Sequence, residues 1–334
     1  EIPVETIEKV EVIQGVASAQ FSELTDGAII IDRKAAQTPW SLVTNVNGGS
    51  TNFSLSKGFN LPSRFGALNL GLNYAISNPD PRDKVKQYDR INTSLMWSTT
   101  FHPKLKNTLS VDYSNRSDEV RMDPDDDTRQ LSYSRNTGFR ISNRFNWRAE
   151  LPFARTINLT VSYNRQSQNS FKQWLLNQSP KGYAYKDTTG IYEGVVLSGR
   201  YIAEEEIIGK PVTASANLNL SQNVNIADVL HVFSYGFSAN YSNNGGRGIV
   251  ADPDRPRWVN TAGQNARPYS FEYLDPLLNY GFFFTDNFKL SVFNRNLISN
   301  LGFRIDQQNG SWSFQPRLST VLKWNSKVDF TAAF

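Results

Sequence analysis

The sequence predicts an all-β protein whose long strands form part of a transmembrane antiparallel β-barrel. Three observations support this fold class. Apolar and polar residues alternate over many segments of about ten residues or more, 13% of the 334 residues are aromatic, and short and long connections alternate along the chain. Strands of soluble β-sandwiches are usually shorter, about five or six residues.

The composition agrees with that class and excludes several others. The 35 basic and 31 acidic residues give a net charge of +4, which is too mild to indicate a nucleic-acid partner. Cysteine is absent, so there is no disulfide framework and no thiolate site. Mean hydropathy is −0.47, and no apolar run approaches the ~18–20 residues that a spanning helix needs.

The first predicted strands follow a short linker at residues 35–39. Trp40 stands where an interfacial aromatic residue is expected at a barrel rim. Residues 41–47 and 51–59 are predicted to pair as a hairpin, because the Gly-Gly-Ser sequence between them is typical of a turn.

The clearest strand in the chain is the segment 66–77. Leu68, Leu70 and Leu72 alternate there with Asn69 and Gly71, so one face is apolar and the other is small and polar. The same alternation, with aromatic residues at many strand ends, predicts ten further strands at 89–101, 105–116, 131–149, 156–168, 211–221, 229–242, 278–286, 296–306, 313–324 and 328–334.

Connection lengths give a second, independent indication of a barrel. The connections 60–65, 102–104, 150–155, 222–228, 287–295 and 325–327 are brief, whereas 78–88, 117–130, 169–210, 243–277 and 307–312 are mostly longer and rich in Pro, Asp, Asn and Gly. Outer-membrane barrels have short periplasmic turns and longer outer loops, and a soluble sandwich gives no reason for that difference.

Thirteen strands cannot close a single-chain antiparallel barrel, which needs an even number in the usual bacterial case. We therefore expect the barrel at 40–334 to be incomplete, although the stretch 190–208 has room for one or two more strands. The alternative of a true C-terminus remains open, because Val328, Phe330 and Phe334 alternate like the last strand of an outer-membrane protein.

Residues 7–34 follow a different pattern from the rest of the chain. A short β-branched run ends at Gly15, small residues follow, and Gly27 opens a second apolar run at residues 28–31. Runs without alternation suit strands that are covered on both faces. This segment is therefore predicted to form a small compact unit ahead of the barrel.

This segment resembles the C-terminal half of the plug domain of TonB-dependent outer-membrane receptors. The resemblance rests on a pattern of acidic, apolar and small residues that ends in a basic residue. The matching residues are Ile7, Glu8, Val10, Glu11, Val12, Gly15, Ser18, Ala19, Phe21, Gly27, Ile29, Ile31 and Lys34. The resemblance implies that residues 1–39 are the C-terminal part of a plug and its linker. It also implies a complete barrel of about twenty-two strands, as in the family.

The resemblance implies a transport function and its partners. Such a receptor binds a scarce nutrient at the surface of a Gram-negative cell and admits it to the periplasm, using energy from the inner-membrane TonB complex. Outer-membrane lipid and a small nutrient ligand are the other expected partners. The Asn-rich and aromatic-rich style resembles receptors of the Bacteroidetes, some of which carry a surface lipoprotein, so a lipoprotein is a further expectation. No nucleic-acid partner and no cofactor are expected.

No catalytic constellation is visible, so the chain is not expected to be an enzyme. His102 and His231 lie far apart in the sequence, without partners at metal-ligand spacing. The carboxylates of Asp123, Asp125 and Asp127 offer hard oxygen ligands for calcium, but their spacing is not that of an EF-hand loop. We favour a solvated acidic loop here and expect no metal.

Candidate ligand contacts lie in the predicted outer loops, where flat aromatic faces and a guanidinium group suit amphipathic or anionic ligands. They are Trp174, Tyr183, Tyr185, Arg247, Trp258 and Tyr269. Polar strand residues, namely Asn69, Asn73, Asp112 and Arg317, are expected to contact the plug or line the path. Glu8 and Glu11 of the plug motif are candidates for ion pairs with the barrel.

Two other functions remain open at this stage. A passive porin or a surface-binding barrel would lack a globular N-terminal unit. A soluble all-β carbohydrate-binding protein would need strands whose apolar faces meet each other. The ligand stays open among siderophore, cobalamin, glycan and peptide, because loop conformation decides specificity.

Overall fold

The computed structural model describes residues 7–14, 19–20, 27–33, 35–62, 65–77, 85–177, 179–184, 194–251, 269–292, 294–324 and 328–333. These residues form one large antiparallel sheet and two small strand pairs, with a single turn of 3-10 helix, η2 (Phe271–Tyr273). The all-β fold predicted from the sequence is confirmed. Among the described residues, no helix is long and apolar enough to cross a membrane.

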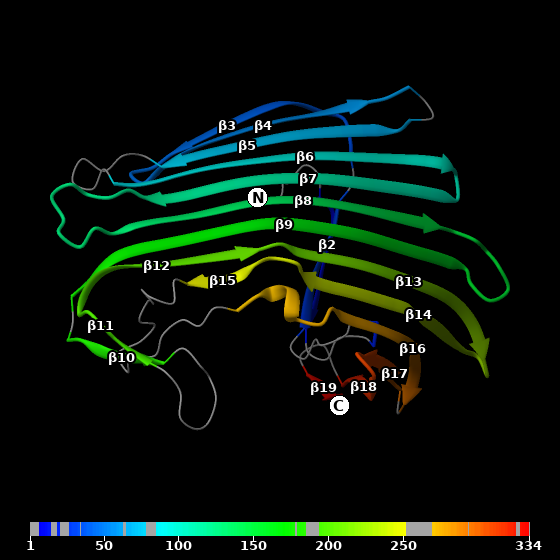
Figure 1. The fold of residues 1–334 in the computed structure, drawn as a ribbon. Coiled ribbons are helices and arrows are strands. Elements are labelled where there is room, and N and C mark those ends of the chain that lie inside the picture. The colour runs from blue at the N-terminus through cyan, green and yellow to red at the C-terminus, as the bar shows by residue number, and fades with distance from the viewer. Residues whose placement is uncertain are drawn as a thin grey trace.

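The large sheet is an antiparallel meander in which neighbours in the sequence are neighbours in space (Figure 1). Its main path runs through β3 (Thr38–Val46), β4 (Ser50–Asn60), β5 (Ala67–Ser77), β6 (Lys86–His102), β7 (Leu105–Val120), β8 (Leu131–Trp147), β9 (Thr156–Asn177), β13 (Pro211–Ile226), β14 (Val229–Asn244), β16 (Leu277–Val292), β17 (Arg295–Gln308), β18 (Ser311–Lys323) and β19 (Asp329–Ala333). Within the described chain these are thirteen strands, one for each predicted segment, and β3 and β19 are the two sheet edges.

Two further strands lengthen this sheet at the end that carries the longer connections. β12 (Arg200–Gly209) pairs with the second half of β9 in the same register that β13 keeps with the first half, so β12 and β13 form one long strand interrupted at Lys210. β15 (Gly248–Ala251) continues β14 after a shift of register and pairs with β12. The expectation of one or two more strands within 190–208 is confirmed by β11 (Gly194–Leu197) and β12, whereas residues 169–177, which were expected in a loop, continue β9.

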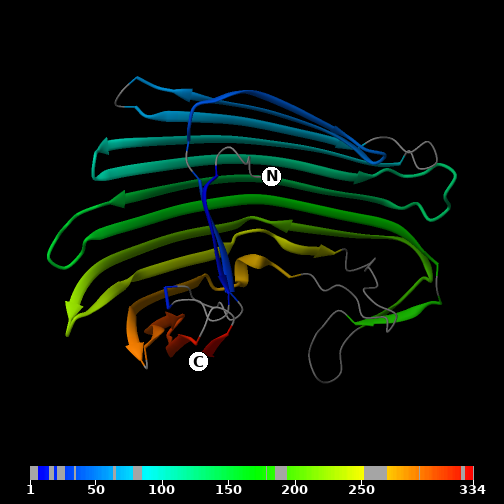
Figure 2. The same cartoon turned by 180° about the vertical axis from the view of Figure 1, so that it is seen from behind.

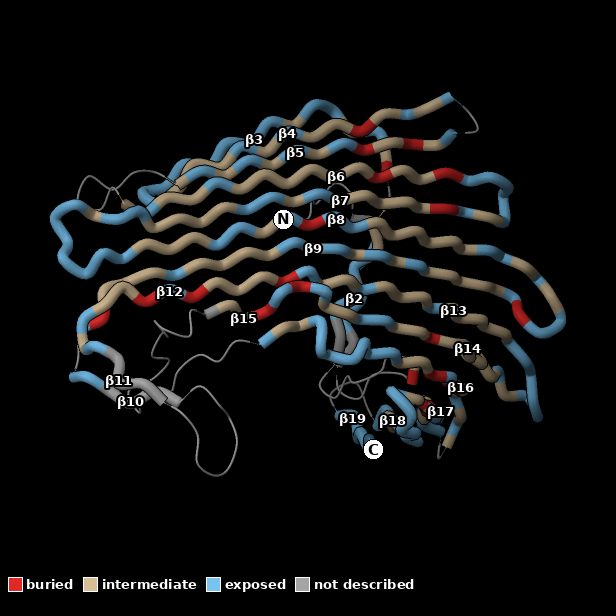
Figure 3. The backbone as a smooth tube through the Cα atoms, viewed as in Figure 1, coloured by how far each residue is buried: buried red, intermediate tan, exposed pale blue. Residues whose placement is uncertain are grey.

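The two faces of the sheet differ sharply in chemistry. On β16 the side chain of Phe282 is 54% exposed, whereas that of its neighbour Phe283, on the opposite face, is 6% exposed. The apolar face carries aromatic rings that meet across strands, such as Phe237 with Phe282 at 5.1 Å and Phe284 with Phe303 at 5.8 Å between centroids. Buried residues are few and scattered over the sheet (Figure 3). This is the reverse of a soluble protein, whose large apolar side chains are mostly inside.

The sheet is curved like a trough, and a pair of strands crosses its hollow side. We call β1 (Ile7–Gln14) and β2 (Gly27–Arg33) the inner ribbon; they pair with each other and run across the direction of the sheet strands (Figures 1 and 2). The remaining pair, β10 (Lys181–Ala184) with β11 (Gly194–Leu197), lies beyond the end of β9.

The linker at residues 35–37 joins the inner ribbon to β3 and lies tightly on the hollow face. The backbone N–H of Ala35 donates to Oγ of Ser98 at 2.8 Å, and that of Ala36 donates to Oδ1 of Asn69 at 2.8 Å. Ala35 also packs against Ala67 and Met96, which form a small buried cluster. These contacts place the linker near the end of the sheet with the short connections, as expected for a chain that enters there.

Gly58 of β4 is required by this close approach, because a Cβ there would lie 2.0 Å from the carbonyl oxygen of Ala36. Gly58→Ala is expected to lower the free energy of unfolding by about 1–3 kcal/mol, since the linker must move away from the strand. Urea unfolding of the purified protein measures this. Gly48→Ala is the control, because a Cβ at Gly48 meets nothing within 4 Å. Equal stability of the two variants would contradict the expectation.

Candidate functional site

The hollow face of the sheet contains a polar cavity of about 960 Å³. Its lining comes from strands β3 to β9 with one residue of β13, and most of the polar side chains are hydroxyls and amides. They are Ser41, Ser54, Ser56, Asn73, Asn92, Ser94, Ser114, Ser162, Asn164, Gln166 and Thr213. Such groups exchange hydrogen bonds with water or a hydrophilic ligand without a fixed charge.

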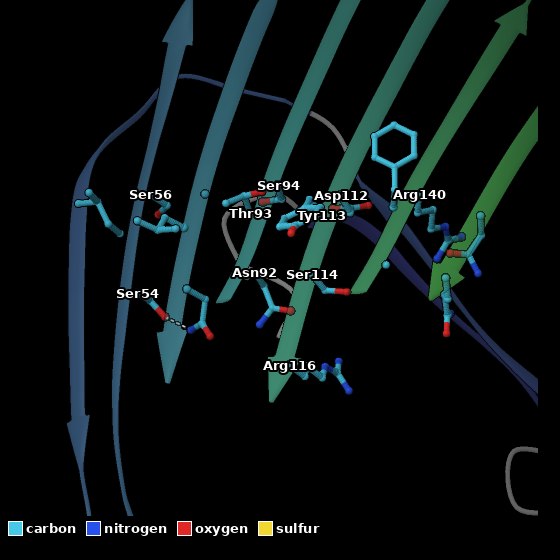
Figure 4. Close-up of a pocket in the computed structure, with 18 of the residues that line it drawn as sticks. Ser54, Ser56, Asn92, Thr93, Ser94, Asp112, Tyr113, Ser114, Arg116 and Arg140 are labelled. Carbon is cyan, nitrogen blue, oxygen red and sulfur yellow. Dashed lines mark hydrogen bonds between the residues drawn. The ribbon is translucent and has the colours of Figure 1, made fainter. Parts of the chain in front are cut away.

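Three charged residues stand in this otherwise neutral lining: Asp112, Arg116 and Arg140. Asp112 on β7 lies directly opposite Arg140 on β8, and the two side chains appear next to each other in Figure 4. Arg116 lies farther along β7, towards the end with the longer connections (Figure 4). Asn73 and Asp112, which sequence analysis placed on the path, both line this cavity.

The end of the inner ribbon contributes a further guanidinium group beside these residues. Arg33 is half-buried, and this burial is the main cause that lowers the pKa of its guanidinium below the ordinary value. The nearby Asp112 carboxylate acts in the opposite direction, and Arg140 lowers the pKa further. The ribbon therefore brings a positive charge to the side of the cavity.

Strand β8 also anchors the ribbon directly. Nη1 of Arg144 forms an ion pair with Oδ1 of Asp32, and Nη2 donates to the carbonyl oxygen of Arg33 at 3.2 Å. On the next part of the sheet, Nδ2 of Asn219 donates to Oε1 of Gln20 at 2.7 Å. All three contacts join the inner ribbon, or residue 20 between its strands, to residues more than a hundred positions away. We call the inner ribbon together with residues 19–20 the ribbon segment.

A second anchor lies on β17, where Arg304 is fully buried on the hollow face. Its Nε donates to both carboxylate oxygens of Asp306, at 2.8 and 2.7 Å, and its Nη2 donates to Oγ of Ser238 at 2.5 Å. Its Nη1 points to the carbonyl oxygens of Ala19 and Gln20 at 3.4 and 3.5 Å. At this anchor the large sheet, which we call the wall, supplies both charged groups, and the ribbon segment supplies only carbonyl dipoles.

Gly281 leaves the space that this cluster occupies. A Cβ at Gly281 would lie 2.0 Å from Oδ1 of Asp306 and 2.6 Å from Nη2 of Arg304. Sequence analysis missed Arg144 and Arg304 because their partners are remote. One signal was available for Arg304: it stands two residues before Asp306 in a strand, which puts both side chains on one face.

Among the plug-motif residues Glu8, Glu11, Gly15, Ser18 and Gly27, the structure describes the side chain of Glu11 alone. Glu11 is exposed and pairs with Lys9 of its own strand at 2.6 Å. Glu8 lies in β1 and Gly27 opens β2, while Gly15 and Ser18 lie outside the described residues. The observed ion pair between ribbon and wall is made by Asp32.

The structure brings two of the candidate ligand contacts close together and leaves another apart. Tyr269 pairs with Ile249 through backbone hydrogen bonds of 2.8 and 2.9 Å, which places it beside Arg247 near the start of β15. Trp174 lies farther away along β9, opposite Ala203 of β12. Tyr183 belongs to β10, and Tyr185 and Trp258 lie outside the described residues.

The acidic loop 121–130 is held by its own hydrogen bonds. Oδ1 of Asp123 accepts from the backbone of Asp125 at 3.0 Å, and the pKa of Asp126 is lowered by hydrogen bonds from the side chain and backbone of Thr128. Asp127 is exposed. Over the ranges that the structure describes, no three His, Asp or Glu residues are placed to hold a metal ion.

Comparison with known proteins finds similarity in structure alone. No protein-family model matches the sequence, and no curated protein matches it. The outer membrane transporter YddB from Escherichia coli is 14% identical with a TM-score of 0.59, over 97% of this chain and 46% of that one. The siderophore receptor PirA from Acinetobacter baumannii is 15% identical with a TM-score of 0.60, over 97% and 47%.

A mutant of the ferric enterobactin receptor PfeA from Pseudomonas aeruginosa is 15% identical with a TM-score of 0.54, over 99% of this chain and 49% of that one. The chain therefore spans about half the length of each of these three structures. At identities this low, the structural similarity establishes a shared fold and nothing more specific.

Proposed function

We propose that this chain, which has the fold of part of a TonB-dependent outer-membrane receptor, is part of a nutrient transporter in the outer membrane of a Gram-negative bacterium. It binds a scarce hydrophilic nutrient outside the cell and admits it to the periplasm. No bond of the ligand is made or broken, so the protein is not an enzyme. Its partners are outer-membrane lipid, the ligand and the inner-membrane TonB complex.

The domain assignment is part of this proposal. Residues 1–39 form the C-terminal part of the plug and its linker, and residues 40–334 form the strands of an incomplete barrel. The apolar outward face meets lipid and the polar hollow face belongs to the lumen. The single observation that carries the proposal is the inner ribbon, which lies across the hollow face; β2 is anchored at Arg144, and residues 19–20 between the two ribbon strands contact Arg304.

A passive porin has no need of such a ribbon, and a soluble sandwich would cover the apolar face with a second sheet. The ribbon blocks the lumen at rest, so passage of the ligand requires energy to displace it. We assign this energy to the TonB complex on the strength of the fold. The outer-loop residues Trp174, Arg247 and Tyr269 are the first candidates for ligand capture, together with Tyr183, Tyr185 and Trp258. A surface lipoprotein is a further candidate partner.

The proposal is tested with the intact gene product in Gram-negative cells. We expect it in the outer-membrane fraction, with a different gel migration before and after heating, because a folded barrel resists detergent. Nutrient uptake that depends on the protein is expected to disappear in cells that lack TonB. Recovery of a soluble protein without detergent would contradict the barrel, and uptake without TonB would contradict the energy source alone.

A further inference from the structure

Two arginines face each other on the hollow side of the sheet, near the end with the longer connections. Arg90 of β6 is the direct cross-strand partner of Arg116 of β7. Both side chains share the face of Asn92 and Ser114, which line the large cavity, because successive side chains of a strand alternate between faces. Like charges directly opposite each other destabilise a sheet, so this pair calls for an explanation.

The neighbours of Arg90 only partly neutralise the pair. Nη2 of Arg90 donates to Oδ1 of Asp118 at 3.0 Å, and the guanidinium carbon lies 4.6 Å from the ring centroid of Tyr88. Nε of Arg90 is buried, and no residue in the described ranges accepts its hydrogen. No carboxylate among the same residues pairs with Arg116.

The surroundings offer room for a ligand. A second cavity of about 520 Å³ borders Arg90, and its lining includes two lysines, Lys86 and Lys172, together with the carboxylates of Asp118 and Glu119. Arg116 lines the larger cavity on the other side of the pair. The two guanidinium groups therefore lie between the longer connections and the greater part of the larger cavity.

We propose that Arg90 and Arg116 together bind an oxyanion, such as a carboxylate or a phosphate group, of the transported ligand. The proposal rests on the proposed transport function and specifies a ligand class within it, an anionic one. A guanidinium group binds two oxygens at once through its planar fork. An oxyanion between the two arginines removes their repulsion.

The outward face provides a matched control. The guanidinium carbon of Arg135 lies 4.6 Å from the ring centroid of Tyr133, and its Nη2 lies 3.2 Å from Oε1 of Glu119, which reproduces the neighbours of Arg90. Arg135 is opposite Ser117, however, and it shares a face with Phe139. It has the same charge at nearly the same place without a second arginine.

Titration calorimetry on the purified full-length protein tests the proposal, with citrate and inorganic phosphate as probes. Arg90→Gln and Arg116→Gln are each expected to weaken binding about tenfold, which matches the usual strength of a hydrogen bond to a charged group. Arg135→Gln is expected to change affinity less than twofold. Asp118→Asn is expected to strengthen binding, because it removes a carboxylate that competes for Arg90.

Four results would overturn the proposal: no binding of either probe by the unaltered protein, an affinity in Arg90→Gln and Arg116→Gln that is unchanged from that of the unaltered protein, a loss in Arg135→Gln as large as in those two variants, or weaker binding in Asp118→Asn. Heat-dependent gel migration of each variant shows that it still folds. Outer-membrane partitioning and TonB-dependent uptake, measured separately, decide the transport function, so failure of the anion site with intact uptake leaves that function standing.

Discussion

Replacement of Arg304 by methionine is expected to be the most damaging single change on the hollow face. The variant leaves the carboxylate of Asp306, which is 5% exposed, without its buried counter-ion. Loss of one partner of a buried pair typically costs about 3–5 kcal/mol. Urea unfolding of the full-length protein in lipid vesicles measures the loss. Arg317 lies on the neighbouring strand β18, on the same face of the sheet as Arg304, and is only partly buried. Arg317→Met is therefore expected to lower the free energy of unfolding far less.

A second readout follows the ribbon segment itself. The sequence contains no cysteine, so Gln20→Cys introduces a unique thiol next to Arg304. We expect Arg304→Met to raise the rate at which a maleimide labels this thiol, because the carbonyls of Ala19 and Gln20 lose their donor.

The combination of Arg304→Met with Asp306→Leu removes both charges and is expected to restore much of the stability. A single variant as stable as the combined one would contradict the role of the pair.

The placement of both charges in the sheet has a consequence for the proposed transport. When the ribbon segment moves away, Arg304 keeps its bonds to Asp306 and Ser238, so no buried charge is left alone. The contacts that must break there are the two long ones to carbonyl oxygens. At the other anchor, between Arg144 and Asp32, displacement separates an ion pair that is partly open to solvent.

The strands could be predicted from the sequence because most of them have one apolar face and one polar face. The sequence alternates with period two wherever the two faces differ in this way, as in Ala67–Ser77. The prediction of the seventh strand ended at residue 168, but β9 runs on to Asn177. Beyond residue 165 both faces of β9 carry polar residues such as Gln166, Ser167 and Gln168. The alternation disappears there although the backbone pairing continues.

The anchors could not be predicted because they depend on distant parts of the chain. Arg304 meets Ala19, and Arg144 meets Asp32, only after the sheet has curved around the ribbon. The pairing of Arg90 with Arg116 depends on the length of the turn at Pro103 and Lys104, and a shift of one residue would point them to opposite faces. A polar contact on the apolar face, between Nδ1 of His231 and Oδ2 of Asp286 at 2.7 Å, was missed for the same reason.

Val161→Arg is expected to have the second largest effect, and this variant tests which face of the sheet meets lipid. Val161 lies in the middle of the part of β9 that pairs with β13, and 46% of its side chain is exposed. Its face carries Leu159 and Tyr163. An arginine on the lipid face of a barrel costs about 2–4 kcal/mol near the bilayer midplane. The cost is measured by equilibrium folding of the full-length protein into phospholipid vesicles.

Ser162→Arg is the matched control, one residue away and on the hollow face. Ser162 lies directly opposite Ser142 and Ser215, and an arginine there meets like charges only diagonally, at Arg140 and Arg144 of β8, beside the polar cavity that Ser162 lines. It loses one hydrogen bond, the 2.7 Å contact with Oγ of Ser215, which contributes about 1 kcal/mol. We therefore expect Val161→Arg to be the more damaging variant in vesicles. Because the difference arises from lipid, equal effects at these two adjacent positions would contradict the assignment of the apolar face to the membrane.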